Sequence, residues 1–326
     1  MSREPPRRTP ESVAATVQLA CLLEVSAPKP GNVSPGCHFA DTRYEDFLAS
    51  AAAIGGPFAG AGSRPLGQTV RLAIEATARW TRANTNLGIV LLLAPLARAA
   101  CQLSADQAPP GPRSTADASA SARAEAGPLD GRKSVGAWPE LRASLARVLD
   151  ETTIDDAWEV YAAIRLAAPG GLGSVDAEDV AEDPTTTLLE AMRLAAGRDR
   201  VAGEYATAFE TTFETGAPAL GRARREGLSW DDAVVETFLT LLAAAPDTHI
   251  ARRAGAALAA DVSSQARAAL HGGGVRSDAG RRAVAEMDRR LRDGRNAANP
   301  GTTADLTAAS IFVELLTGGW RRPVGH

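Results

Sequence analysis

The feature that most constrains the fold is a strongly apolar segment within residues 83–100, ANTNLGIVLLLAPLARAA. A helix formed here would be apolar on nearly every face, and such a helix is normally buried by other elements on all sides. Its longest apolar run, residues 87–97, contains 11 residues including Pro95. That run is well short of the ~20 residues needed to cross a bilayer. We therefore expect a central helix surrounded by other helices, and no membrane span.

The rest of the chain also favours helices. Ala, Arg and Leu are the most frequent residues, whereas Ile and the aromatic residues that strands prefer are sparse. We predict an all-α fold, a single compact multi-helix globule over residues 1–326, with a disordered Pro-, Ala- and Ser-rich insertion at about residues 104–137. Besides the central helix, the predicted helices span approximately residues 11–25, 44–54, 66–81, 141–149, 154–167, 185–196, 200–214, 231–244, 248–270, 278–292 and 302–316.

The charge balance and the cysteine content limit which binding partners and which cellular compartment are expected. Asp plus Glu outnumber Lys plus Arg by only 39 to 35, so no global basic field indicates nucleic acid as a partner. Three cysteines without metal-binding spacing argue against a secreted disulfide scaffold. Arg7 and Arg8 precede an apolar stretch as in a secretion signal, but Gln18 and Glu24 interrupt it. We expect a cytoplasmic protein.

A loop rich in proline and glycine, residues 24–41 (EVSAPKPGNVSPGCHFAD), follows the first predicted helix. Proline fixes backbone torsions, so this loop has little conformational entropy to lose when it binds a ligand. It presents Lys29, Asn32, His38 and Asp41 at fixed separations. These groups suit a binding site for a charged ligand, although a polar connection between two helices would have a similar composition.

Polar segments of this kind recur at predicted helix starts. Helix N-termini carry unpaired amides and about half a positive charge, so several of them in one cleft would bind a polyphosphate. We predict a nucleotide-binding cleft formed by helix N-termini and loops. The four segments are PKPGNVSPGCHFAD (28–41), NTNLG (84–88), APDTHIARR (245–253) and NPGTTADL (299–306).

Each segment also has a purely structural interpretation. Asp247 with Thr248, Asn86, and the residues around Asp305 could simply cap the helices that begin there. His249, taken alone, would more often be a satisfied, partly buried histidine than a catalyst. The acidic loop at residues 169–184 is either a solvated surface loop, which we favour, or a lid and cation site. Signatures of P-loop, dinucleotide-binding, zinc-protease and serine-hydrolase sites are absent from the sequence.

Taken together, the four segments resemble the motifs of the triphosphoribosyl-dephospho-coenzyme A synthase family. The family patterns are PKPG-x-V…H-x-x-D, DT-x-x-x-R-x-G and SPGG-x-ADLLA, together with an asparagine–threonine and glycine segment that opens a buried helix. Two differences, Thr302 in place of a second glycine and Leu87 in place of a basic residue, indicate a divergent branch. The matching residues are Lys29, Pro30, Gly31, Val33, His38, Asp41, Asp247, Thr248, Arg253, Pro300, Gly301, Ala304, Asp305 and Leu306.

The resemblance implies an all-helical transferase that uses ATP and Mg²⁺. Its reaction would be attack by the 2′-hydroxyl of dephospho-coenzyme A on C1′ of the ATP ribose, with release of adenine and retention of the triphosphate. Such a displacement passes through an oxocarbenium-like state, which requires a nearby carboxylate and a base, and the triphosphate requires cations and amides.

The resemblance also implies residue roles. Lys29 and Arg253, assisted by Arg252, would bind the triphosphate, and His38 or Asp41 would take the proton of the attacking hydroxyl. Asp247 and Asp305 would hold Mg²⁺, with Asp247 also catalytic. The remaining substrate-binding residues would be Asn32, Asn86, Thr248 and Gly301.

Two other functions stay open at this level. An enzyme of the same fold could transfer its group to a different acceptor in cofactor synthesis. A helical protein that only binds nucleotide would bind ATP without forming adenine. The oligomeric state is not predicted.

Overall fold

The computed structural model describes residues 9–106, 137–170, 177–292 and 296–320, and within these ranges every regular element is a helix. The predicted all-α fold is confirmed for this part of the chain. Most of the insertion expected at about residues 104–137 lies outside the described residues, and its two ends belong to α5 and α6. The helices are α1 (Pro10–Ser26), α2 (Tyr44–Ala53), α3 (Gly55–Ala59), α4 (Leu66–Ala78), α5 (Leu87–Asp106), α6 (Ala137–Asp150), α7 (Ile154–Ala167), α8 (Leu188–Ala195), α9 (Arg200–Ala206), α10 (Ala217–Arg225), α11 (Trp230–Ala244), α12 (Thr248–Ala254), α13 (Ala256–His271), α14 (Asp278–Leu291) and α15 (Gly301–Leu316), with a π-helical turn at Thr211–Gly216 and a 3₁₀ turn at Gly274–Arg276.

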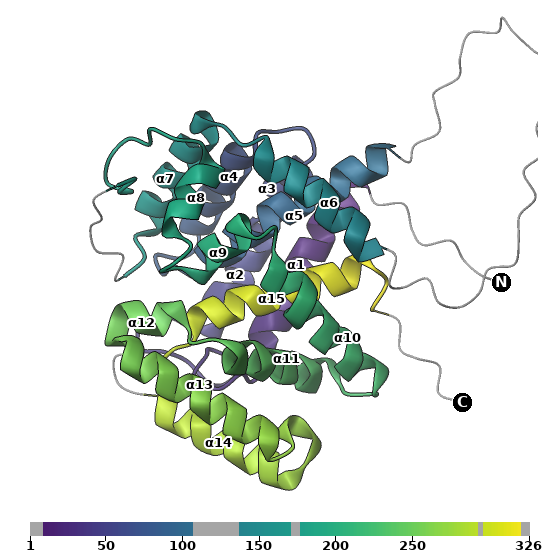
Figure 1. The fold of residues 1–326 in the computed structure, drawn as a ribbon, viewed down its shortest axis with the longest axis vertical. Helices are drawn as coiled ribbons and strands as arrows, with labels where there is room; N and C mark the ends of the chain where they lie inside the picture. The colour runs from purple at the N-terminus through teal and green to yellow at the C-terminus, as the bar shows by residue number, and fades with distance from the viewer. Residues whose placement is uncertain (1–8, 107–136, 171–176, 293–295, 321–326) are drawn as a thin grey trace, which may run out of the picture.

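Two helices, α5 and α15, form the centre of the fold (Figure 1). The first packs on α1, α4, α6 and α15, and α15 in turn packs on α1, α10 and α11. Val90, Leu92 and Leu96 of α5 are completely buried. An 18-residue window of α5 is long and apolar enough to cross a bilayer, but 72% of it is buried within the fold, as expected for a core helix. The central position inferred from the apolar segment is confirmed.

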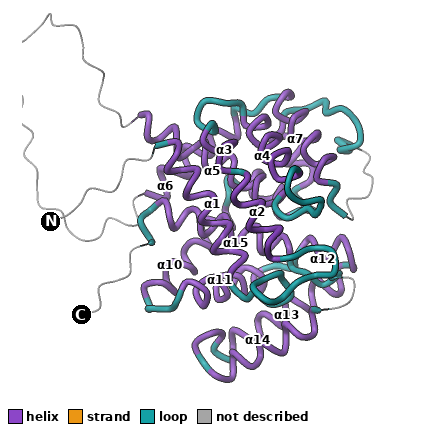
Figure 2. The backbone as a smooth tube through the Cα atoms, turned by 180° about the vertical axis from the view of Figure 1, so that it is seen from behind, coloured by secondary structure: helices purple, strands orange, loops and turns teal. Residues whose placement is uncertain are grey.

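The remaining helices are arranged around this pair. Helices α1 to α9 surround α5 on one side of α15, and α10 to α14 lie on the other side (Figures 1 and 2). At the far edge of the second group, α13 packs between α11 and α14. As a result, the N-termini of α5, α9, α12 and α15 all face the region between the two groups, where the candidate site lies.

Two expected helices are interrupted for backbone reasons. The helix predicted over residues 248–270 is split at Gly255, whose φ of 93° is left-handed and ends α12. The helix predicted over residues 200–214 stops after α9 because Ala208 and Phe209 both have positive φ. Phe209 is completely buried, so core packing holds a backbone conformation that its side chain disfavours.

Gly67 allows α4 and α7 to pack closely. Its amide donates a hydrogen bond to Asp156 Oδ1 at 2.7 Å, and a β-carbon at this position would overlap the backbone of Asp156. Backbone atoms cannot rotate out of the way as a side chain would. We expect Gly67→Ala to lower the free energy of unfolding by about 2 to 3 kcal/mol in chemical denaturation.

Gly56→Ala is the matched control, because no atom lies within 4 Å of the added methyl group and Gly56 lies in a helix. It should be neutral or slightly stabilising. Equal effects of the two substitutions would contradict the close packing at Gly67.

Candidate active site

Two adjoining cavities form one cleft between the helix N-termini. The larger cavity has a volume of about 260 Å³, and the smaller one about 100 Å³. We call them the large and the small chamber, and we call the residues that line both of them the throat. The throat consists of Asn84, Leu87, Gly88, His249 and Asp305.

Glycine is required at the throat on the α5 side. A β-carbon at position 88 would overlap the carboxylate of Asp305, so only glycine lets this carboxylate lie against the first turn of α5. On the other side, a β-carbon at Gly301 would lie 3.3 Å from the His249 ring, so the start of α15 is close to α12. The glycines of the NTNLG and NPGTTADL segments therefore bring three chain segments into contact.

Asp305 has an unusual electrostatic environment. No hydrogen bond to its carboxylate occurs among the described residues, although it is only partly exposed to the cleft. Burial raises the pKa of the Asp305 carboxyl well above its usual range, and the negative charges of Glu24 and Asp247 raise it further. An acidic group held without a partner in a cleft is a candidate for binding a cation or a developing positive charge.

His249 lies at the throat with an unsatisfied nitrogen. Its Nε2 is buried and has no hydrogen-bond partner. Burial lowers the pKa of the imidazole, which keeps it neutral at pH 7. The expected satisfied histidine is therefore not observed. The position of His249 at the throat depends on its closeness to Gly301, a contact between distant segments that the local sequence does not reveal.

Asp247 joins two helix starts and does not line either chamber. It is completely buried. Its Oδ1 accepts hydrogen bonds from the amides of His249 at 2.8 Å and Ile250 at 3.1 Å, and its Oδ2 accepts two from the amide and hydroxyl of Thr303, both at 2.7 Å. All its lone-pair directions are therefore used by protein donors. In this geometry Asp247 is a positioning residue that caps α12 and aligns α15 with it.

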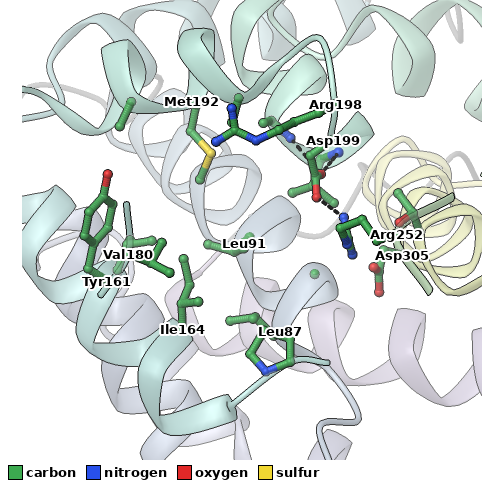
Figure 3. Close-up of a pocket in the computed structure, with 18 of the residues that line it drawn as sticks. Leu87, Leu91, Tyr161, Ile164, Val180, Met192, Arg198, Asp199, Arg252 and Asp305 are labelled. Atoms are coloured by element: carbon green, nitrogen blue, oxygen red, sulfur yellow. Dashed lines mark hydrogen bonds and ion pairs between the residues drawn. The ribbon is translucent and has the colours of Figure 1, made fainter. Parts of the chain in front are cut away.

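The large chamber has a polar end and an apolar end (Figure 3). At the polar end, Arg252 pairs with Asp199, which also caps α9 through hydrogen bonds to the amides of Val201 and Ala202. The Nε of Arg252 remains buried without a partner. Arg198 also lines this end, and the apolar end is walled by Leu87, Leu91, Val160, Ile164, Val180, Leu188 and Met192.

The described end of the acidic loop, residues 177–184, contributes to the wall of the large chamber. Glu178 and Val180 line it, and Tyr161 donates a hydrogen bond to Glu178 Oε2 at 3.0 Å. The pKa of Glu178 is lowered mainly by its hydrogen bond from Thr185. This end is therefore anchored to the cleft, in contrast to the favoured interpretation of a fully solvated loop. Residues 171–176 of the loop lie outside the described residues.

The small chamber contains the asparagine side chains. Asn32, Asn86 and Gly301 line it. Thr248 lines neither chamber, and its hydroxyl hydrogen-bonds at 3.2 Å to that of Thr302, which lines the large chamber. Asn86 donates to Thr77 Oγ1 at 3.0 Å, and Asn32 donates to Asn299. Segments more than 250 residues apart in sequence thus meet in one wall, as the clustering of motifs predicted.

Six residues expected in the site do not line either chamber: Asp247 and Thr248, described above, and Lys29, His38, Asp41 and Arg253. Lys29 is 1% exposed and forms an ion pair with Glu24 at 3.0 Å, so its ammonium holds the loop in place. His38 is exposed and its Nδ1 accepts a hydrogen bond from the amide of Tyr44 at 3.2 Å. Asp41 and Arg253 are also exposed. Their assigned roles would require rearrangement of the loop or of α12.

Of the two carboxylates expected to bind Mg²⁺, one is available to do so. Mg²⁺ in phosphate sites is typically held by one or two carboxylates together with phosphate oxygens and water. The unpartnered carboxylate of Asp305 suits this use, whereas the lone pairs of Asp247 are occupied. Among the described residues no cluster of three acidic, His or Cys side chains forms a complete cage. Any Mg²⁺ here would therefore depend on the substrate for most of its ligands.

Taken together, the helices and the two chambers define an all-helical protein, within the described residues, with a cleft between converging helix N-termini. The chain belongs to the ATP:dephospho-CoA triphosphoribosyl transferase family, whose family model matches residues 10–324. This confirms the family resemblance carried by the four motifs.

Related proteins carry names from the same family. A probable 2-(5''-triphosphoribosyl)-3'-dephosphocoenzyme-A synthase of Pseudomonas aeruginosa strain UCBPP-PA14 is 38% identical over 115 residues, which is 34% of this chain and 39% of that protein. The protein of that name in Stutzerimonas stutzeri is 34% identical over 117 residues, covering 36% of this chain and 40% of its own. The matched region thus spans about two fifths of the length of these curated relatives.

A solved structure extends the similarity to most of the chain. It is the crystal structure of an Archaeoglobus fulgidus protein assigned as a triphosphoribosyl-dephospho-coA synthase. That structure is 26% identical and superposes with a TM-score of 0.58, covering 84% of this chain and 100% of the other.

Proposed function

We propose that this protein transfers the 5-triphosphoribosyl group of ATP to the 2′-hydroxyl of 3′-dephospho-CoA and releases adenine. The bond between C1′ and the adenine nitrogen breaks, a bond between C1′ and the acceptor oxygen forms, and the hydroxyl proton leaves with the departing base. The observation that carries the proposal is the throat, where the Asp305 carboxylate and the His249 Nε2 both lack hydrogen-bond partners within the described part of the chain.

The cleft offers what this displacement needs. Electron density leaves C1′ in the transition state, and a nearby unpaired carboxylate stabilises the resulting positive charge. Asp305 supplies this carboxylate or, together with the phosphates, holds Mg²⁺, which would neutralise phosphate charge. Neutral His249 can accept a hydrogen bond from the attacking hydroxyl or donate one to the departing base. At the polar end of the large chamber, Arg252 and Arg198 suit the triphosphate.

Adenine release tests the proposed function. The purified full-length protein is incubated with ATP, Mg²⁺ and either dephospho-CoA, CoA or pantetheine phosphate, and products are separated by liquid chromatography with mass detection. We expect equimolar adenine and a triphosphoribosylated product with dephospho-CoA only. No adenine with any acceptor, or formation of ADP in its place, would contradict the proposal. The unpaired thiols of Cys21, Cys37 and Cys101 suit the reducing cytoplasm, where we place this reaction.

Removing Arg252 is expected to weaken ATP binding. Arg252→Ala should raise KM for ATP about 10- to 100-fold because a charge-assisted contact to phosphate is lost, with a smaller change in KM for dephospho-CoA. Arg253→Ala is the matched control on the next residue, which lies outside the cleft, and should change KM less than about threefold. A larger increase in KM for ATP in Arg253→Ala than in Arg252→Ala would indicate that Arg253 binds the phosphates.

A further inference from the structure

The small chamber differs from the large one in charge. Of the residues that the structure describes, no Lys or Arg lines it, whereas the carboxylates of Glu24 and Asp305 do. Lys29 is close but is used by Glu24 and by backbone carbonyls. A chamber with acidic groups and no cation repels phosphate. The small chamber therefore disfavours a phosphate group and suits an uncharged part of a substrate.

The walls of the small chamber suit a flat, aromatic group. Phe39 and Phe47 line it together with Val25, Val33 and Ile89. Aromatic rings provide stacking surface for a heterocycle, worth on the order of 1 to 3 kcal/mol per base. Both phenylalanines are partly exposed, so they are available for contact. By comparison, the large chamber has Tyr161 in its lining, with the hydroxyl bonded to Glu178, and its apolar wall otherwise consists of aliphatic side chains and Met192.

An asparagine in this wall is held rigidly and has an unused acceptor. Asn32 is 6% exposed, and its Oδ1 is buried without a hydrogen-bond partner. Its backbone carbonyl accepts a hydrogen bond from Arg292 at 2.9 Å, and the amide of the preceding Gly31 donates to Asp288 Oδ1 at 2.8 Å. A buried acceptor without a donor costs about 1 to 3 kcal/mol, so a donor on the ligand would be favourable there.

We propose that the small chamber is a nucleobase subsite that takes a purine carrying an amino group, with Asn32 Oδ1 accepting from that amine and Phe39 and Phe47 contacting the ring. This inference rests on the proposed function, in which both substrates contain adenine. Adenine in the small chamber would place the ribose that carries it at the throat, beside Asp305 and His249. The triphosphate would then extend toward Arg252 in the large chamber.

Binding of free adenine tests the subsite without relying on turnover. Calorimetric titration of the full-length protein should show adenine bound about tenfold more tightly than purine, which lacks the amino group. Asn32→Ala should bind the two equally, because the acceptor is gone. Arg198→Ala, in the large chamber, should retain the tenfold preference. Equal binding of adenine and purine by the wild type, or a retained preference in a folded Asn32→Ala variant, would overturn the proposal.

A second variant covers the case in which Asn32→Ala does not fold. Phe39→Leu should weaken the binding of adenine and of purine by a similar factor, about five- to tenfold, because stacking on the ring does not depend on the amino group. Unchanged binding in Phe39→Leu would count against the subsite.

Competition experiments identify whether the adenine group of ATP or that of dephospho-CoA occupies the small chamber. Displacement of bound adenine by ATP in the absence of acceptor assigns the chamber to the departing base, and displacement by dephospho-CoA alone assigns it to the base of the acceptor. Displacement by neither would overturn the proposal. Adenine binding without adenine release from ATP would refute the proposed reaction and leave the subsite standing, so the two failures are distinguishable.

Discussion

Asp305→Asn is expected to reduce the rate of adenine release about 10²- to 10³-fold, as the loss of a main electrostatic contact to a transition state typically does. The carboxylate lies at the throat, lacks a protein partner and is held among other negative charges. Asparagine preserves its shape but cannot balance positive charge at C1′ or at Mg²⁺. Single-turnover measurements at saturating ATP and dephospho-CoA should show the loss in the chemical step.

The same substitution should stabilise the protein. An unpaired, poorly solvated carboxylate costs folding energy, so Asp305→Asn should raise the free energy of unfolding by about 1 kcal/mol at pH 7. Because the folded pKa of Asp305 is raised, the carboxyl binds its proton more tightly in the folded protein than in the unfolded chain. Its contribution to stability is full below the unfolded pKa and is lost as pH rises through the folded pKa. The advantage of the asparagine variant should therefore grow with pH over that window.

Thermal unfolding of both proteins between pH 4 and 8 provides the check. A variant that is both inactive and less stable would indicate that Asp305 is a structural residue, contrary to its role at the throat.

Asp247→Ala is expected to lower the free energy of unfolding by about 3 to 5 kcal/mol, one of the largest effects of any single substitution in this fold. The carboxylate accepts four hydrogen bonds from the starts of α12 and α15 in a completely buried position. Alanine would leave all four donors without a partner. Chemical denaturation measures the loss, and activity should fall with it because both helix starts line the cleft.

Ser229→Ala is the matched control for an ordinary helix cap. Ser229 accepts a single hydrogen bond from the amide of Asp232 at 3.1 Å, and its loss should cost about 1 kcal/mol. Asp247→Asn distinguishes a structural role of Asp247 from a chemical one. An amide side chain can accept only some of the four hydrogen bonds, so this variant should also be less stable than the wild type. An Asp247→Asn protein as stable as the wild type but inactive would show that Asp247 acts on the substrate or on Mg²⁺.

Much of the fold follows from local sequence. The segment that forms α5 is buried because it is apolar on nearly every face. From this property alone the sequence predicts that other helices surround it. The breaks at Gly255 and Phe209 were not predicted. Gly255 is one glycine in an alanine-rich segment, and the left-handed backbone of Phe209 is held by core contacts that no local pattern reveals.

The sequence predicts which segments form the candidate site more accurately than which of their side chains face the cleft. The four polar segments do meet, because their prolines, glycines and caps mark helix starts that the fold brings together. Which side chain faces the cleft depends on distant partners. Glu24 draws Lys29 into the interior. Thr303 takes the free lone pairs of Asp247, and close packing at Gly301 brings His249 to the throat.

We place the displacement of adenine at the throat between the two chambers. A crystal structure of Asp305→Asn soaked with ATP, Mg²⁺ and dephospho-CoA tests it most directly, because this variant should bind both substrates and turn over slowly. We predict density for the ATP ribose beside Gly88 and His249, with the triphosphate at Arg252. Nucleotide density in another part of the protein, with an empty throat, would contradict the account.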